Sequence, residues 1–226
     1  MTKIADFVKT MDVSNANPAG APRSKQHALR TGTTTLGMVV REGVILAADK
    51  RATEGAFIAS KTADKIHPIS KSIAMTIAGS VADAQYLIDL MNAEARLYEL
   101  KNGKMAPVNT IVKILANELY RSKYPVPYEV QHIVGGVDDE GPKLYDVGGD
   151  GSILKETCTS TGSGSLYAYG VLEDGYKEGM SIEEGVELAK KAVKASISRD
   201  IFSGNGIDLF VITKEGIEKR WVDLRK

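Results

Sequence analysis

The sequence has 226 residues, 43% of them apolar, and its 29 basic side chains are balanced by 29 acidic ones. This length allows one substantial hydrophobic core, but the zero net charge provides no electrostatic surface for nucleic acid or for an anionic membrane. No stretch approaches the about 18 to 20 continuous apolar residues of a membrane-spanning helix. Neither nucleic acid nor a membrane is therefore an expected partner.

The N-terminus, the cysteine and the histidines bear on compartment and cofactors. Lys3, Asp6 and Lys9 interrupt the apolar centre that a secretory signal needs. The only cysteine, Cys158, cannot form an intramolecular disulfide, and the three histidines lack the spacing of a metal site. A thiol protease that pairs Cys158 with His67 is disfavoured, because neither residue has a visible orienting partner. We therefore expect a cytoplasmic protein with no cofactor and no metal.

The first part of the chain divides into a polar tail and a β-hairpin. The stretch that ends at Arg30 is polar and contains Pro, Gly and Ala, so it can bury little apolar surface and is expected to be disordered. Apolar runs over 36–40 and 44–48 then predict a hairpin. We therefore expect residues 1–32 to be a tail and residues 33–226 to be one folded domain.

Groups of strands and pairs of helices alternate in the rest of the chain. A buried strand over 72–78 ends where Ser80 can cap a helix, and the capping box Ser181-x-x-Glu184 opens another. The glycine-rich segment over 148–151 is predicted to be a turn, because it lacks the spacing and the lysine of a nucleotide-binding loop. The further predicted elements are, in chain order, helices over 81–102 and 107–124, strands over 129–137, 144–147 and 155–160, helices over 165–175 and 181–199, and strands over 207–212 and 217–221.

This grouped order indicates an α+β fold, because parallel βαβ units would alternate one by one. Each antiparallel sheet needs cover on at least one face. We therefore expect two stacked antiparallel sheets flanked by helices, which is a four-layer αββα sandwich.

The junction between Gly32 and Thr33 is a candidate site of chemistry. A hydroxyl is a weak nucleophile and needs an adjacent base. If the Gly32–Thr33 bond is cut, Thr33 carries both a hydroxyl and an α-amine, whose ordinary pKa is about 7.7 to 8.0. The run of threonines also suits an ordinary strand of high β propensity, so this junction alone does not decide the function.

Several short segments in fixed order resemble the motif series of proteasome core-particle β subunits, closest to the archaeal type. The match covers nearly everything from Gly32 to the C-terminus. The segments are Thr33-Thr34-Thr35-Leu36-Gly37, Ala48-Asp49-Lys50-Arg51, Lys65, Thr76-Ile77-Ala78-Gly79-Ser80, Thr161-Gly162-Ser163-Gly164-Ser165 and Ser198-Arg199-Asp200-Ile201-Phe202-Ser203-Gly204. The resemblance implies the N-terminal-nucleophile hydrolase fold, which agrees with the predicted layers, and a threonine endopeptidase.

The resemblance also implies roles for individual residues. Thr33 would be the nucleophile, and its freed amine would take and return the proton. Lys65 would favour the deprotonated hydroxyl, and Asp49 would orient the lysine ammonium and balance its charge. Further implied catalytic residues are Gly79, whose backbone N–H would face the oxyanion, and Ser163, Asp200 and Ser203, which would form a hydrogen-bonding group around the amine.

Substrate binding is implied in the same way. The family binds peptides as an added antiparallel strand, along main-chain groups near Thr53, Gly79 and Val81. The positions that match its primary side-chain pocket hold small or apolar residues, namely Ala52, Ala63, Ile77 and Val81. We therefore expect cleavage after large hydrophobic residues, although the same positions would also suit an ordinary core.

The resemblance gives the residues before Thr33 a meaning. In the uncut chain the Thr33 nitrogen is an amide and cannot act as a base. The resemblance implies that Thr33 attacks the carbonyl of Gly32 and releases residues 1–32 as a propeptide. Glycine at position 32, which has no Cβ, would allow the strained turn that this attack needs.

The expected partners follow from the same family. They are proteasome α subunits, other β subunits in stacked seven-membered rings, an ATP-dependent unfoldase acting through the α ring, and unfolded protein substrates. A noncatalytic structural subunit of a proteasome-like ring is the alternative. Such chains lack the cleavable glycine–threonine junction or the lysine partner, whereas this sequence has both.

Overall fold

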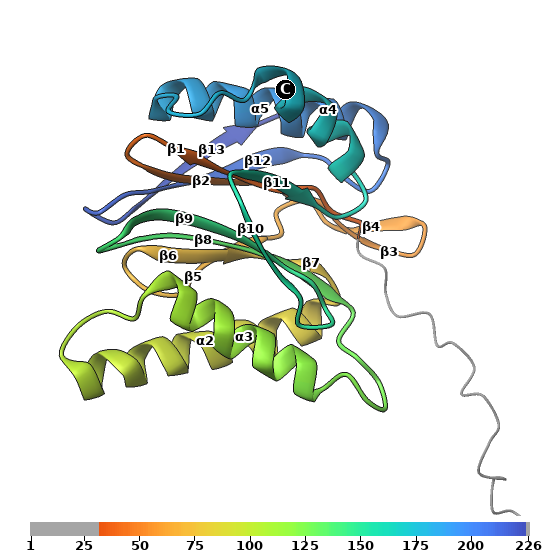
Figure 1. The fold of residues 1–226 in the computed structure, drawn as a ribbon. Helices are drawn as coiled ribbons and strands as arrows, with labels where there is room; N and C mark the ends of the chain where they lie inside the picture. Colours follow the sequence, from red (N-terminus) through yellow and green to blue (C-terminus); the bar gives the residue numbers. More distant parts are fainter. Residues whose placement is uncertain (1–31, 225–226) are drawn as a thin grey trace, which may run out of the picture.

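Four layers make up the part of the chain that the computed structural model describes, residues 32–224 (Figure 1). The predicted tail lies outside these described residues, apart from Gly32. The layers are, from one side to the other, the helices α4 (Ser165–Gly175) and α5 (Ile182–Arg199), a five-stranded sheet, a six-stranded sheet, and the helices α2 (Val81–Asn102) and α3 (Val108–Arg121). The predicted αββα sandwich is confirmed.

The strands of both sheets pair only antiparallel within the described residues. The five-stranded sheet has the order β11 (Cys158–Thr161), β1 (Thr35–Val40), β2 (Gly43–Asp49), β12 (Gly206–Ile212) and β13 (Ile217–Asp223). The other has the order β10 (Ile153–Glu156), β9 (Gly141–Val147), β8 (Val130–Asp138), β6 (Ile73–Thr76) and β5 (Ile66–Pro68), with β7 (Ala78–Gly79) also paired to β8.

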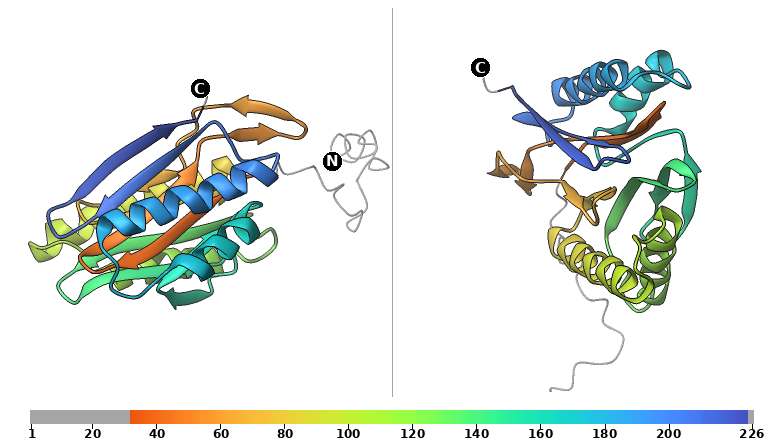
Figure 2. Two further views of the ribbon diagram at one scale, coloured as in Figure 1. Left: turned by 90° about the horizontal axis from the view of Figure 1, so that it is seen from above. Right: turned by 90° about the vertical axis from the view of Figure 1, so that its left-hand side faces the viewer.

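Strand β2 shows how the sequence sets the layers. All its residues are buried, because its side chains alternate between two covered faces. Leu46 packs between the two sheets, whereas its neighbour Ile45 packs toward α4 and α5. The right-hand view of Figure 2 shows the helices on both outer faces of the stack. No helix among residues 32–224 combines the length and the apolar character that crossing a bilayer requires.

Local capping signals predicted the helix ends well. Ser80 accepts a hydrogen bond from the backbone N–H of Asp83, and Gly103 ends α2 with a left-handed φ of 67°. The capping box of Ser181 and Glu184 is present at the start of α5. Helix α3 stops at Arg121 instead of reaching position 124, since the residues before the prolines that follow disfavour helical geometry.

Two strand predictions need correction. The strand predicted over 155–160 is two strands, β10 and β11, which belong to different sheets; the chain crosses between the sheets at Thr157 (Figure 1). The strand predicted over 72–78 is broken at Ile77, whose N–H donates to the Lys65 carbonyl at 2.9 Å. Strand β5 and the hairpin of β3 (Ala52–Glu54) and β4 (Phe57–Ser60) were not predicted.

Candidate active site at the start of the first strand

Thr33 lies two residues before the start of β1 and is only 2% exposed. Its backbone N–H donates to the Ser163 hydroxyl at 3.1 Å, and that hydroxyl donates to Asp200 Oδ2 at 2.6 Å. Ser203 Oγ donates to the same carboxylate oxygen at 2.7 Å and bonds the hydroxyl of Thr34 at 2.8 Å. The predicted group of Ser163, Asp200 and Ser203 therefore meets at the nitrogen side of Thr33.

A buried acid and a buried lysine lie next to this group. Asp49 Oδ1 accepts from the backbone N–H of Thr34 at 2.8 Å and from Lys65 Nζ at 2.7 Å. Its other oxygen accepts from the backbone N–H groups of Arg51 and Gly204, both at 2.9 Å. Asp49 is fully buried, and its carboxylate accepts these four hydrogen bonds. This arrangement fixes the lysine ammonium beside the residue that follows Thr33.

Burial and the ion pair act on the pKa of Lys65 in opposite directions. Removal from water disfavours the ammonium, whereas Asp49 favours it. The burial effect is the larger one and lowers the pKa of Lys65 below its ordinary value. Lys65 can therefore release its proton more readily than a surface lysine can.

Two glycines let a loop approach Thr33 closely. Gly162 has a left-handed φ of 90°, and a Cβ on it would lie 2.2 Å from the Thr33 carbonyl oxygen. A Cβ on Gly164 would lie 2.0 Å from the Thr34 hydroxyl, and the Gly164 N–H donates to the Thr33 carbonyl at 3.2 Å. These small residues bring Ser163 within hydrogen-bond reach of the Thr33 nitrogen.

A cleft of about 690 Å³ opens beside Thr33. Gly79 is in its wall with a φ of 117°, and a Cβ there would lie 2.1 Å from the Glu129 carbonyl oxygen. The lining residues are Gly32, Ala78, Gly79, Ser80, Glu129, Val130, Gln131, Gly162, Ser163 and Phe202. The cleft thus has the predicted oxyanion residue, Gly79, and one residue of the predicted cleavage junction, Gly32, in the same wall.

The other residues predicted to bind substrate do not line this cleft. They are the pocket positions Ala52, Ala63, Ile77 and Val81, and Thr53 beside the predicted peptide strand. Their segments adjoin Lys65 and Gly32 instead: Ile77 N–H donates to the Lys65 carbonyl, and Gly32 N–H donates to Thr53 Oγ1 at 3.3 Å. The hydrophobic pocket therefore stays a prediction.

Several residues at the site were not singled out from the sequence. The backbone N–H groups of Thr34 and Gly204 donate to the Asp49 carboxylate, and the Arg51 side chain donates to the Ile201 carbonyl at 2.7 Å. Phe202 packs against Gly32. Thr34, Arg51, Phe202 and Gly204 all lie inside the motifs that carry the family resemblance, next to residues that were assigned roles, so proximity in the sequence was the available signal.

The thiol alternative finds no support in its surroundings. Cys158 lies on β11 and packs against the core under α4 and α5. Burial raises the pKa of its thiol to about 12, so the reactive thiolate is scarce at neutral pH. Among residues 32–224, no group of three or more His, Cys, Asp or Glu side chains could hold a metal ion.

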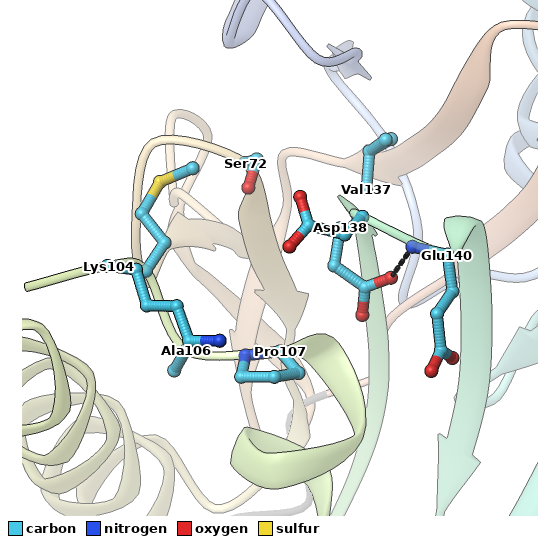
Figure 3. A pocket seen from close by; sticks show the side chains of 9 residues that line it. Ser72, Lys104, Ala106, Pro107, Val137, Asp138 and Glu140 are labelled. Atoms are coloured by element: carbon cyan, nitrogen blue, oxygen red, sulfur yellow. Dashed lines mark hydrogen bonds between the residues drawn. The ribbon is translucent and has the colours of Figure 1, made fainter. Parts of the chain in front are cut away.

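A second cavity, of about 330 Å³, lies at the opposite end of β8 (Figure 3). Strand β8 leaves the wall of the cleft at Val130 and reaches this cavity at Asp138, a span of about 26 Å at the usual rise per residue. Asp138 accepts from the backbone N–H groups of Val108 and Glu140, both at 3.0 Å. None of the predicted site residues lines it, and Asp138 here secures the start of α3.

The four-layer sandwich, with a threonine at the start of its first strand, is the fold of N-terminal-nucleophile hydrolases. The family described as "Proteasome subunit" matches residues 29–212. The chain is 49% identical over 197 residues to "Proteasome subunit beta" of Methanocorpusculum labreanum, which covers 86% of this chain and 92% of that protein. It is 48% identical over 188 residues to "Proteasome subunit beta" of Methanopyrus kandleri, covering 83% and 90% of the two chains.

A third relative is "Proteasome subunit beta 2" of Aeropyrum pernix, which is 45% identical over 205 residues, 91% of this chain and 92% of that protein. The chain therefore belongs to the proteasome subunit family, and its similarity to archaeal β subunits confirms the resemblance found in the sequence.

Proposed function

We propose that this chain is a peptidase-active β subunit of a proteasome core particle, with Thr33 as the nucleophile. The observation that carries the proposal is the bond from Thr33 N to Ser163 Oγ, because Ser163 is in turn held by the buried carboxylate of Asp200. Once the Gly32–Thr33 bond is cut, the same Ser163 and Asp200 side chains can hold the new Thr33 amine in place as a proton acceptor.

The first proposed reaction removes residues 1–32. The Thr33 hydroxyl attacks the Gly32 carbonyl carbon, the C–N bond between the two residues breaks, and the Thr33 nitrogen gains the proton that the hydroxyl loses. The product is an ester between Gly32 and the Thr33 side chain. Water then hydrolyses the ester, which releases the propeptide with a terminal carboxyl group and restores the hydroxyl.

The second proposed reaction cleaves peptide substrates. The freed amine accepts the hydroxyl proton, the hydroxyl oxygen forms an ester with the substrate acyl group, and the amine passes the proton to the departing substrate nitrogen. Water then hydrolyses the ester. Lys65 is proposed to assist deprotonation of the Thr33 hydroxyl, supported by its buried pair with Asp49, and the Gly79 backbone is proposed to face the oxyanion from the wall of the cleft.

Membership of the family supports assembly with other proteasome subunits. We propose stacked seven-membered β rings between α rings, an ATP-dependent unfoldase that delivers unfolded proteins through the α ring, and a place in the cytoplasm. The preference for cleavage after large hydrophobic residues belongs to the same proposal. Residues 33–226 would then be the mature catalytic domain.

The test is a Thr33→Ala variant of the full chain, coexpressed with an α subunit. We expect wild type to lose residues 1–32 in intact-mass measurements and to hydrolyse fluorogenic peptides that end in a large hydrophobic residue. The variant should keep its full mass and show no hydrolysis. Peptide hydrolysis by Thr33→Ala, or by wild-type particles that retain residues 1–32, would point to another nucleophile. Assembled wild-type particles that hydrolyse no peptide would favour the noncatalytic subunit.

A further inference from the structure

Gly32 lies against Phe202 in a way that excludes any side chain at position 32. A Cβ built on Gly32 would lie 1.8 Å from Phe202 Cβ and 2.3 Å from Phe202 Cγ. Carbon atoms that are not bonded to each other normally stay about 3.5–4.0 Å apart. Alanine, the smallest chiral residue, is therefore already too large at this position.

Side-chain rotation cannot relieve this contact. The position of a Cβ is set by its own backbone, and the backbone around Phe202 is held on both sides. Phe202 N–H donates to Asp200 Oδ1 at 3.2 Å, Ser203 N–H donates to the Asp200 carbonyl at 3.1 Å, and Gly204 N–H donates to Asp49 Oδ2 at 2.9 Å. The two acids that surround Thr33 therefore also fix the Phe202 backbone.

Position 32 is restrained as well. Its N–H donates to Thr53 Oγ1 at 3.3 Å, and its Cα continues into the buried Thr33. A side chain at position 32 would have to move either this segment or the Phe202 turn. Reaction requires the attacking oxygen and the carbonyl carbon to be about 3–3.5 Å apart, and a displacement of about 1 Å can slow a reaction about 100-fold.

We propose that Phe202 restricts position 32, directly before the nucleophile, to glycine. The Cβ of Phe202 occupies the space that the Cβ of any other residue at position 32 would need. This inference rests on the proposed self-cleavage at Gly32. Phe202 acts on specificity: it decides which residue can present its carbonyl to Thr33. The need for glycine is thus assigned to a named contact, in addition to the turn geometry expected from the sequence.

The experiment compares Gly32 with Gly32→Ala in three backgrounds of the full chain: native, Phe202→Ala and Phe202→Gly. Loss of residues 1–32 is followed by intact mass over time, and the ratio of the two cleavage rates is taken within each background. We expect a ratio of about 100 in the native background. Phe202→Ala keeps its Cβ and should keep that ratio, whereas Phe202→Gly removes the Cβ and should lower it to about 10 or less.

Two substitutions serve as matched controls. Gly170→Ala places a Cβ where the structure has open space, and Phe57→Gly removes an exposed phenylalanine. Neither should change the cleavage-rate ratio at position 32. Equal cleavage of Gly32 and Gly32→Ala chains in the native background overturns the proposal, and so does a folded Phe202→Gly background that keeps the ratio of about 100.

If the Phe202→Gly chain does not fold, the proposal is tested by a series of substitutions at position 32 in the native background. Because the Cβ is the clashing atom, Gly32→Ala and Gly32→Ser should both be slowed about 100-fold, and normal cleavage of either overturns the proposal. Failure of the proposed function looks different: the wild-type chain itself would then keep residues 1–32.

Discussion

Replacing Asp49 by asparagine should strongly destabilise the fold. Asp49 accepts hydrogen bonds from four donors, two on each carboxylate oxygen, and one of the donors is the buried ammonium of Lys65. Asparagine offers a single carbonyl oxygen. Whichever way its amide group turns, its NH₂ faces two donors, so two hydrogen bonds are lost and two polar groups are left buried without a partner.

The magnitude follows from these contacts. A hydrogen bond to a charged group contributes about 1.5–3 kcal/mol, so the loss of two amounts to about 3–6 kcal/mol. Breaking a buried ion pair by removing one partner independently suggests about 3–5 kcal/mol. Since a domain is stable by only about 5–15 kcal/mol, Asp49→Asn should lose a large part of the stability. A matched surface change, Glu187→Gln in an exposed pair with Lys190, should cost far less, because solvent and salt screen such a pair.

The assay is urea unfolding followed by circular dichroism. All chains carry Thr33→Ala, so that none is processed and the free energies of unfolding are comparable. A loss for Asp49→Asn as small as the loss for Glu187→Gln would refute the reasoning, because it would mean that the four observed hydrogen bonds contribute little.

Two further predictions concern His132 and Asp200. His132 is fully buried, with no hydrogen-bond partner for Nε2 among the described residues, and burial lowers its pKa to about 4. The neutral ring is therefore favoured in the fold, and its contribution to stability is present above about pH 6.5 and is lost as the pH falls toward 4. Between pH 7 and pH 5 the free energy of unfolding should fall by about 2 kcal/mol because of His132. In His132→Gln this part of the pH dependence should be absent from urea midpoints. A variant with the same pH dependence as the parent chain would contradict the low pKa of His132. Asp200→Asn weakens the hydrogen bond that holds Ser163 at the Thr33 nitrogen. In steady-state kinetics kcat should therefore fall about 100-fold with little change in KM. A change in KM alone would place Asp200 in substrate binding instead.

The sequence by itself was enough to predict the helices and the identity of the family. The capping residues Ser80 and Ser181 and the left-handed Gly103 act within one helical turn, so their effect can be predicted from neighbouring residues. The grouped order of strands and helices was enough to predict the αββα layers. Short motifs in fixed order were enough to identify the relationship to proteasome β subunits, and the same motifs are the basis for proposing Thr33 as the nucleophile.

Contacts between distant segments were decided only by the tertiary structure. Thr33 and Ser163 are 130 positions apart, and no periodicity can show that a serine loop reaches the first strand. The split of the predicted strand at Thr157 depends on which sheet each half joins, and so does the packing of Phe202 on Gly32. These features arise because close packing and burial act on residues that are neighbours in space, and a linear pattern contains no information on which of them meet.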